Sequence, residues 1–226
     1  MMSPGEFTLR SGAALYFLVT AGSLLAQSHD WKIIPGERVG PLTPASGLAD
    51  LQRQFGAANV REEPIHVGEG FYEPGVVIYK EKPSRTLGVV WQKGELPQRP
   101  HVVYICYGQK RDGACEWKTP EGISLRTALS QLEKLNRRPF SLAGFGWDYG
   151  GVVLGWNGGL LEASLQKGGR VVLLLEPAEA AATNEANMRD YGQVIGDHTF
   201  SSSHPAMLKL DPRVYAIIVE FTAAPH

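Results

Sequence analysis

Apolar side chains recur at helical spacing in two short segments of the chain. The first segment, residues 44–55, follows Thr43 as a candidate N-cap, and Gly56 supplies a left-handed stop. The second segment, residues 122–135, carries leucines three or four residues apart and ends at Asn136. Helices this short are marginal on their own, so we expect each of them to dock on a sheet.

After each helix the pattern changes to short apolar runs bounded by Gly and Pro, which is typical of strands. The chain is therefore expected to have an α+β fold of two helix-plus-antiparallel-meander halves, residues 29–115 and 116–226, and the repetition suggests an internal duplication. The last run, Val214–Phe221, is apolar almost throughout, which predicts a strand inside a sheet. The other expected strands are residues 60–67, 75–79, 86–91 and 102–107 in the first half, and residues 140–143, 152–156, 160–165 and 170–175 in the second.

The N-terminal segment has the pattern of a cleavable signal peptide. Arg10 precedes an uncharged apolar run over residues 13–25, and this run of about a dozen residues is shorter than the roughly 20 that span a bilayer. The small residue Ala26 suits a cleavage site. The sequence predicts a signal peptide over residues 1–28 and a soluble, periplasmic or secreted protein; the alternative is an uncleaved membrane anchor.

The charge and the cysteines refine this picture. With 22 Lys and Arg against 23 Asp and Glu, the chain has no basic excess, so neither nucleic acid nor an anionic membrane surface is expected as a partner. Cys106 and Cys115 are the only two cysteines. In an oxidising compartment they are expected to form a disulfide across a Gly-containing turn; two free buried thiols are the alternative. No metal or cofactor site is expected.

The order of a glycine-led entry, a short helix and a meander resembles the αβ unit of the SmpA/BamE type. Tandem copies of that unit occur in the β-lactamase-inhibitor protein family, and residues 144–151 resemble a segment of uncharacterised secreted bacterial proteins. The resemblance extends over residues 36–176. It implies protein–protein contact without catalysis or cofactor. The lipidated cysteine typical of the SmpA/BamE group is missing here, which argues against a role in outer-membrane assembly.

The most distinctive segment is residues 144–151, Gly-Phe-Gly-Trp-Asp-Tyr-Gly-Gly. Trp147 and Tyr149 flank Asp148, so two rings and a carboxylate could stand at a loop rim and grip a sugar or a peptide. The alternative is a tight turn whose glycines take positive φ, whose rings fill the core and whose carboxylate bonds backbone amides. The functional hypothesis is a binding site for a protein or glycan outside the cytoplasm, with Trp147, Asp148 and Tyr149 as its residues.

A secreted hydrolase acting on glycan or peptide is the competing hypothesis. Its best acid–base pair would be Asp148 and Glu69, and glycosidase chemistry would need their carboxyl groups about 5–9 Å apart. No Gly-x-Ser-x-Gly elbow occurs in the chain. His198 and His204 lie near a run of serines, but Pro205 predicts an irregular loop there, so no metal site is expected. Binding is therefore favoured over catalysis.

Overall fold

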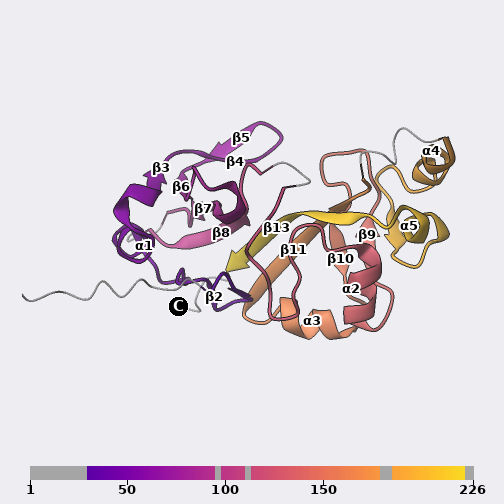
Figure 1. Cartoon of the computed structure of the whole chain (residues 1–226), viewed down its shortest axis with the longest axis horizontal. Coiled ribbons are helices and arrows are strands. Elements are labelled where there is room, and N and C mark those ends of the chain that lie inside the picture. The colour runs from indigo at the N-terminus through magenta and orange to yellow at the C-terminus, as the bar shows by residue number, and fades with distance from the viewer. Residues whose placement is uncertain (1–29, 95–97, 110–112, 179–184, 222–226) are drawn as a thin grey trace, which may run out of the picture.

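A computed structural model describes residues 30–94, 98–109, 113–178 and 185–221 of the chain (Figure 1). The predicted signal peptide lies outside the described residues. The fold is of the α+β class, as the sequence predicts, with helices and several antiparallel sheets. Its bulk is a six-stranded sheet to which both predicted halves contribute strands.

The order of the large sheet is β11-β13-β8-β7-β6-β3, with every neighbouring pair antiparallel. The C-terminal strand β13 pairs with β11 on one side and with β8 on the other, which confirms the prediction of a strand inside a sheet. In Figure 1 this strand, in yellow, runs between the indigo-to-magenta part of the chain and the orange part. The strands are β3 (Val60–Glu62), β6 (Gly75–Ile78), β7 (Leu87–Trp91), β8 (Pro100–Ile105), β11 (Gly169–Glu176) and β13 (Arg213–Phe221).

Smaller elements surround this sheet. A three-stranded sheet has the order β10-β9-β12. Two hairpins, β1–β2 and β4–β5, form separate two-stranded sheets. The short strands are β1 (Ile33–Ile34), β2 (Arg38–Val39), β4 (Ile65–Gly68), β5 (Phe71–Glu73), β9 (Ser141–Ala143), β10 (Val153–Gly155) and β12 (Thr199–Ser201). The helices are α1 (Leu48–Phe55), α2 (Leu129–Asn136), α3 (Leu160–Leu165), α4 (Glu185–Gly192) and α5 (Pro205–Leu210), with 3₁₀ turns η1 (Ala57–Asn59) and η2 (Pro83–Arg85).

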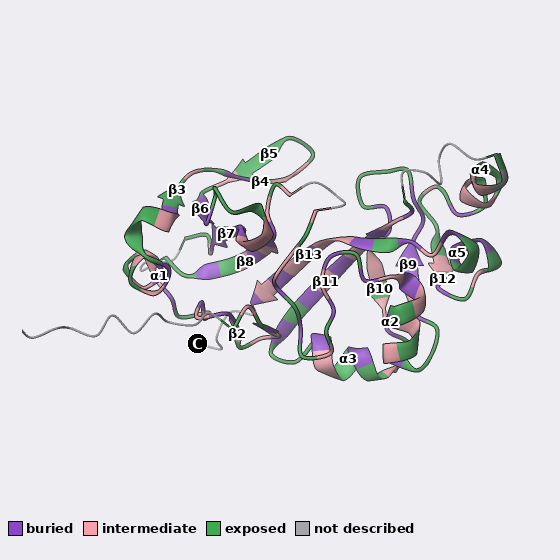
Figure 2. Cartoon of the chain, viewed as in Figure 1, coloured by how far each residue is buried: buried purple, intermediate pink, exposed green. Residues whose placement is uncertain are grey.

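One hydrophobic core lies on the inner face of the large sheet and draws on both halves of the chain. Trp117 and Phe140 are fully buried in it, and Val171, Leu173 and Leu175 of β11 alternate with half-buried neighbours, as a sheet with one covered face requires. Figure 2 shows buried residues along the sheet strands and exposed ones on the β4–β5 hairpin. The two predicted halves therefore share a core, and the division at residue 115 stays a prediction.

Both predicted helices exist but begin later than the sequence predicts. The helix α1 starts at Leu48, and the carboxylate of Asp50 accepts a hydrogen bond from the Gly47 N–H at 2.9 Å. Residues 43–46 form a turn instead. Likewise, α2 starts at Leu129 after another hydroxyl-stabilised turn. In each case a side chain near the predicted start bonds the backbone in a non-helical turn, as Ser, Thr and Asp tend to do.

The prediction of a strand over residues 160–165 is wrong, because this segment is the helix α3. Leu161 and Leu165, one turn apart, are the buried residues. The buried amide of Asn136 accepts a hydrogen bond from the Leu161 N–H at 3.1 Å and thereby satisfies one N-terminal donor. A short apolar run does not separate strand from helix by periodicity, and this one lacks β-branched residues. Since α3, α4 and α5 interrupt the strands of the second half, the structure does not confirm an internal duplication.

Candidate binding surface

The β4–β5 hairpin presents two aromatic side chains to solvent. Its turn, residues 68–70, has positive φ at all three positions (120°, 49° and 76°), which the two glycines adopt readily. The turn is followed by Phe71 and Tyr72, which are 65% and 63% exposed. The Tyr72 ring lies 5.2 Å from that of its cross-strand partner His66. Sequence reasoning missed Phe71 and Tyr72; the available signal was an aromatic pair directly after a Gly-containing turn.

The root of this hairpin is fixed to the outer face of the large sheet. Ile65 is fully buried and packs with Val77 and Val90 in a small hydrophobic cluster separate from the main core. The N–H of His66 donates a hydrogen bond to the hydroxyl of Tyr107 at 2.7 Å. The hairpin is therefore anchored at its base, while its exposed strand β5 stands at the top of the view in Figures 1 and 2.

The loop over residues 144–151 connects β9 to β10 and touches the end of β11. Gly146 and Gly151 have positive φ (82° and 74°), in line with the glycine-rich pattern of this segment. Gly151 lies so close to β11 that an added Cβ would stand 1.8 Å from the carbonyl oxygen of Leu175. The Leu175 N–H in turn donates to the carbonyl of Gly151 at 2.9 Å. Only glycine permits this approach, so the base of the loop is held firmly against the sheet.

This loop holds its two rings at the surface and not in the core. Trp147 is 37% exposed and Tyr149 is 55% exposed. The indole N–H of Trp147 donates to the carbonyl of Gly144 at 2.9 Å, which fixes that ring. The ring centroids of Trp147 and Tyr149 are 5.6 Å apart with planes at 68°. The core-filling alternative for these rings therefore does not hold.

The hairpin and the loop meet at Tyr149. Hydrogen bonding to the carboxylate of Glu69 is the main cause that raises the pKa of Tyr149, and the negative charges of Glu69 and Asp148 raise this pKa further. The phenol thus bridges the tip of the β4–β5 hairpin and the loop 144–151. We call the surface made by Glu69, Phe71, Tyr72, Trp147, Asp148 and Tyr149 the two-loop surface.

The two carboxylates of the hydrolase hypothesis thus lie around one phenol, but at an open rim. Glu69 and Asp148 are both exposed. Two shallow cavities of about 360 and 470 Å³ exist near the hairpin root, and both are lined by Glu63 and Pro64. Neither cavity is lined by Glu69 or Asp148. These two carboxylates therefore border a shallow aromatic surface and not these cavities.

The histidine and serine run has a local structural role. Ser201 and Ser203 hydroxyls bond each other at 2.8 Å, and the Nδ1 atom of His204 accepts a hydrogen bond from the Ala206 N–H at 3.2 Å. Contrary to the prediction of an irregular loop, Pro205 begins the helix α5, because proline suits the first helical position and His204 caps it. Within the described ranges, no group of three His, Cys, Asp or Glu side chains could hold a metal ion.

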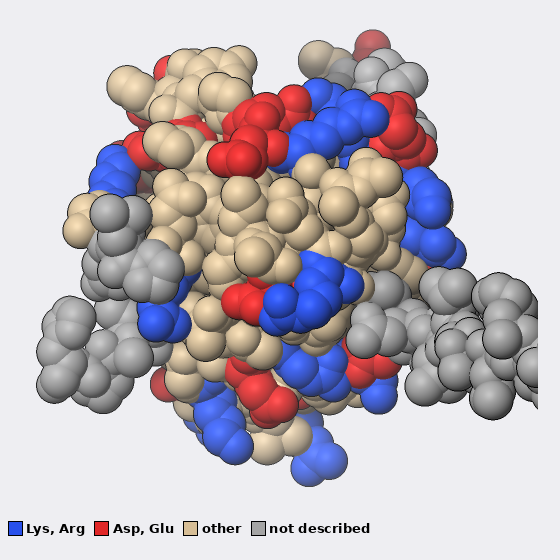
Figure 3. Space-filling view, turned by 90° about the vertical axis from the view of Figure 1, so that its left-hand side faces the viewer, with Lys and Arg blue, Asp and Glu red and all other residues tan. Residues whose placement is uncertain are grey.

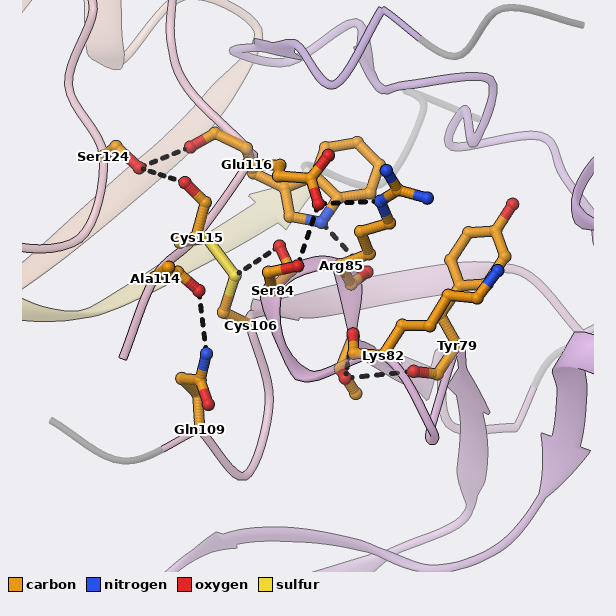
Figure 4. The surroundings of a disulfide bond; sticks show 12 residues. Tyr79, Lys82, Ser84, Arg85, Cys106, Gln109, Ala114, Cys115, Glu116 and Ser124 are labelled. Carbon is orange, nitrogen blue, oxygen red and sulfur yellow. Dashed lines mark hydrogen bonds and ion pairs between the residues drawn. A yellow bond between two sulfur atoms is a disulfide. The ribbon is translucent and has the colours of Figure 1, made fainter. Parts of the chain in front are cut away.

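The predicted disulfide between Cys106 and Cys115 is confirmed, with a Cα–Cα distance of 6.1 Å (Figure 4). It ties the end of β8 to a segment that also contacts the 3₁₀ turn η2. The carboxylate of Glu116 accepts hydrogen bonds from the Ser84 hydroxyl and from Nε of Arg85, both at 2.8 Å. Hydrogen bonding to Arg85 lowers the pKa of Glu116. This cluster therefore has a structural role.

The side of the molecule that carries α1 and β3 shows acidic and basic side chains next to one another (Figure 3). Arg53 pairs with Asp50 on α1. The ion pair of Lys80 and Glu63 spans 2.6 Å. Because the two signs alternate, this face has no extended region of positive or of negative potential, which agrees with a chain that has no basic excess. Among the helices that the structure describes, none is long and apolar enough to cross a membrane.

Comparison with protein families, with curated proteins and with solved structures finds no match to this chain. The resemblance to SmpA/BamE-type units therefore stays an expectation.

Proposed function

We propose that this chain is an exported binding protein that recognises a partner outside the cytoplasm through the two-loop surface, without catalysis. One observation carries the proposal: four aromatic side chains from two distant segments, between 37% and 65% exposed, lie on two loops joined at Tyr149. Aromatic residues are enriched among the residues that dominate binding energy at interfaces. Exposing rings to water without a partner gains the fold nothing.

The rigidity of the surface supports the same conclusion. The hairpin root is packed on the sheet through Ile65, and the loop base is held against β11 through Gly151. The polar groups of Trp147 and Tyr149 bond to the chain itself. A surface ordered before binding loses less conformational entropy when the partner arrives. The disulfide between Cys106 and Cys115 is compatible with the predicted export, because such bonds persist in oxidising compartments.

The hydrolase hypothesis has weaker support. A general acid at neutral pH needs a carboxyl group whose ionisation is disfavoured by burial, whereas Glu69 and Asp148 are exposed. One of these carboxylates is also engaged by the Tyr149 hydroxyl. The arrangement suits recognition better than proton transfer.

The test is capture of a partner from the exported fraction by the purified protein and by surface variants. Phe71→Ala and Tyr149→Ala are expected to weaken capture by about tenfold or more each, as buried aromatic anchors do. Leu160→Ala is the matched control, since Leu160 is 54% exposed on α3, at the bottom of the view in Figure 1. If the Leu160 variant loses capture as much as the other two, or if all three keep it, the two-loop surface is not the binding site.

A further inference from the structure

The two-loop surface carries two negative charges that the protein itself does not neutralise. Neither Glu69 nor Asp148 forms an ion pair with a Lys or Arg in the part of the chain that the structure describes. The other carboxylate of this hairpin, Glu73, differs. It pairs with Lys93 at 2.7 Å, so the chain does place a cation beside a hairpin acid elsewhere.

The rings beside these charges form an angled pair and not a flat platform. The Trp147 and Tyr149 planes meet at 68° with their centroids 5.6 Å apart, which is an edge-to-face contact, and the Tyr149 side chain remains 55% exposed. The face of an aromatic ring is the negative part of its quadrupole, and it attracts the ammonium group of Lys or the guanidinium group of Arg. The exposed carboxylates of Glu69 and Asp148 beside this pair of rings therefore favour a cation over a neutral glycan.

The polar groups of both rings are already used within the chain, so a ligand would meet the exposed ring surface and the carboxylates. Trp147 donates its N–H to a carbonyl, and Tyr149 bonds to Glu69. One oxygen of Glu69 can hold the phenol while its other oxygen faces a ligand, because a carboxylate accepts several hydrogen bonds. Asp148 forms no hydrogen bond to a described residue and keeps both of its oxygens.

We propose that the two-loop surface receives a cationic side chain, Arg or Lys, from an exposed segment of the partner protein. The aliphatic part of that side chain would pack on Phe71, and its charged end would lie over the exposed part of the Trp147 and Tyr149 ring pair, beside the carboxylates of Glu69 and Asp148. Charge complementarity selects this partner. The inference rests on the proposed function and specifies the chemistry of the ligand.

The experiment uses two short peptides, acetyl-Gly-Gly-Arg-Gly-Gly-amide and the same peptide with neutral citrulline in place of arginine. Binding is followed through the indole N–H resonance of Trp147 in nuclear magnetic resonance spectra, assigned by its loss in Trp147→Phe. The arginine peptide should shift this resonance in a saturable way, and the citrulline peptide should bind about tenfold more weakly. Raising the salt concentration from about 50 to about 500 mM should weaken binding of the arginine peptide and leave binding of the citrulline peptide almost unchanged.

The double variant Glu69→Gln and Asp148→Asn removes both charges while it keeps the shape of the surface. It should lower the affinity for the arginine peptide about tenfold, so that the two peptides bind with similar affinities. Glu133→Gln, on α2, is the matched control and should bind like the unaltered protein. Equal binding of the two peptides by the unaltered protein, or an undiminished preference for arginine in the double variant, overturns the inference.

A neutral oligosaccharide, the tetramer of N-acetylglucosamine, separates this inference from the proposed function. If the sugar shifts the Trp147 resonance and the arginine peptide does not, the cation inference fails while a binding role for the surface stands. If neither probe shifts it and the alanine variants of Phe71 and Tyr149 keep full partner capture, both proposals fail.

Discussion

Removing the disulfide between Cys106 and Cys115 should lower the free energy of unfolding by an amount that depends on the length of the loop that the bond closes. The two residues are nine positions apart. Closing a loop of about ten residues lowers the entropy of the unfolded chain by about 9 cal/mol/K, which is about 2.7 kcal/mol at 25 °C. For a protein of this size, that loss corresponds to a fall in Tm of about 5–11 °C.

The measurement is urea and thermal unfolding of the protein with and without a thiol reductant, followed by circular dichroism. The double variant Cys106→Ala and Cys115→Ala should be less stable than the oxidised protein by about 3 kcal/mol, because Cys106 is also buried and its sulfur packs against neighbours. This variant must show no response to the reductant. If oxidised and reduced protein unfold at the same urea concentration, the bond does not stabilise the fold by restricting the unfolded chain.

Two further predictions concern Asn136 and the junction of the two loops. Asn136→Ala should lower the free energy of unfolding by about 2–4 kcal/mol in urea titrations, because it leaves the buried N–H of Leu161 without its partner and removes the amide hydrogen bonds to the carbonyls of Trp156 and Arg138; a loss under about 1 kcal/mol would show that water replaces the amide. The Tyr149 pKa is raised, so the contact of its hydroxyl with Glu69 should persist at neutral pH and be lost as the pH rises above about 10 through that raised value. In Glu69→Gln, tyrosinate absorbance assigned by difference from Tyr149→Phe should appear at lower pH, and an unchanged titration would mean that the two side chains do not meet.

The sequence predicts the strands of the large sheet because their apolar runs are long relative to their turns. β7 and β13 match the predicted runs to within a residue. The sequence does not predict the helix α3, because the spacing of its few leucines does not distinguish a helix from a strand. What decides it is the amide of Asn136, which comes from α2 and meets the Leu161 N–H only after the chain has folded.

The candidate site divides in the same way. The glycines of residues 144–151 indicate a turn, but the sequence leaves open whether its rings fill the core or stand at a rim, and the structure has both rings exposed. The hairpin half of the two-loop surface could not be derived, because the contact between Glu69 and Tyr149 joins segments far apart in the chain. Sequence reasoning paired Glu69 with Asp148 as an acid and a base. The structure instead has a phenol between the two segments, which depends on how the hairpin lies over the sheet.

The position of β13 inside the sheet also sets the order in which the molecule can be assembled. Ile217 pairs with Ile105 of β8, a separation of roughly a hundred positions, and such distant pairing makes folding slow. During synthesis, β3, β6, β7 and β8 can form early, but β11 lacks its only neighbour in this sheet until residues 213–221 have been made. The nascent chain therefore keeps the edge of β8 that faces β13 unpaired while the second half of the chain is made. A chaperone that binds extended apolar segments would find its target there.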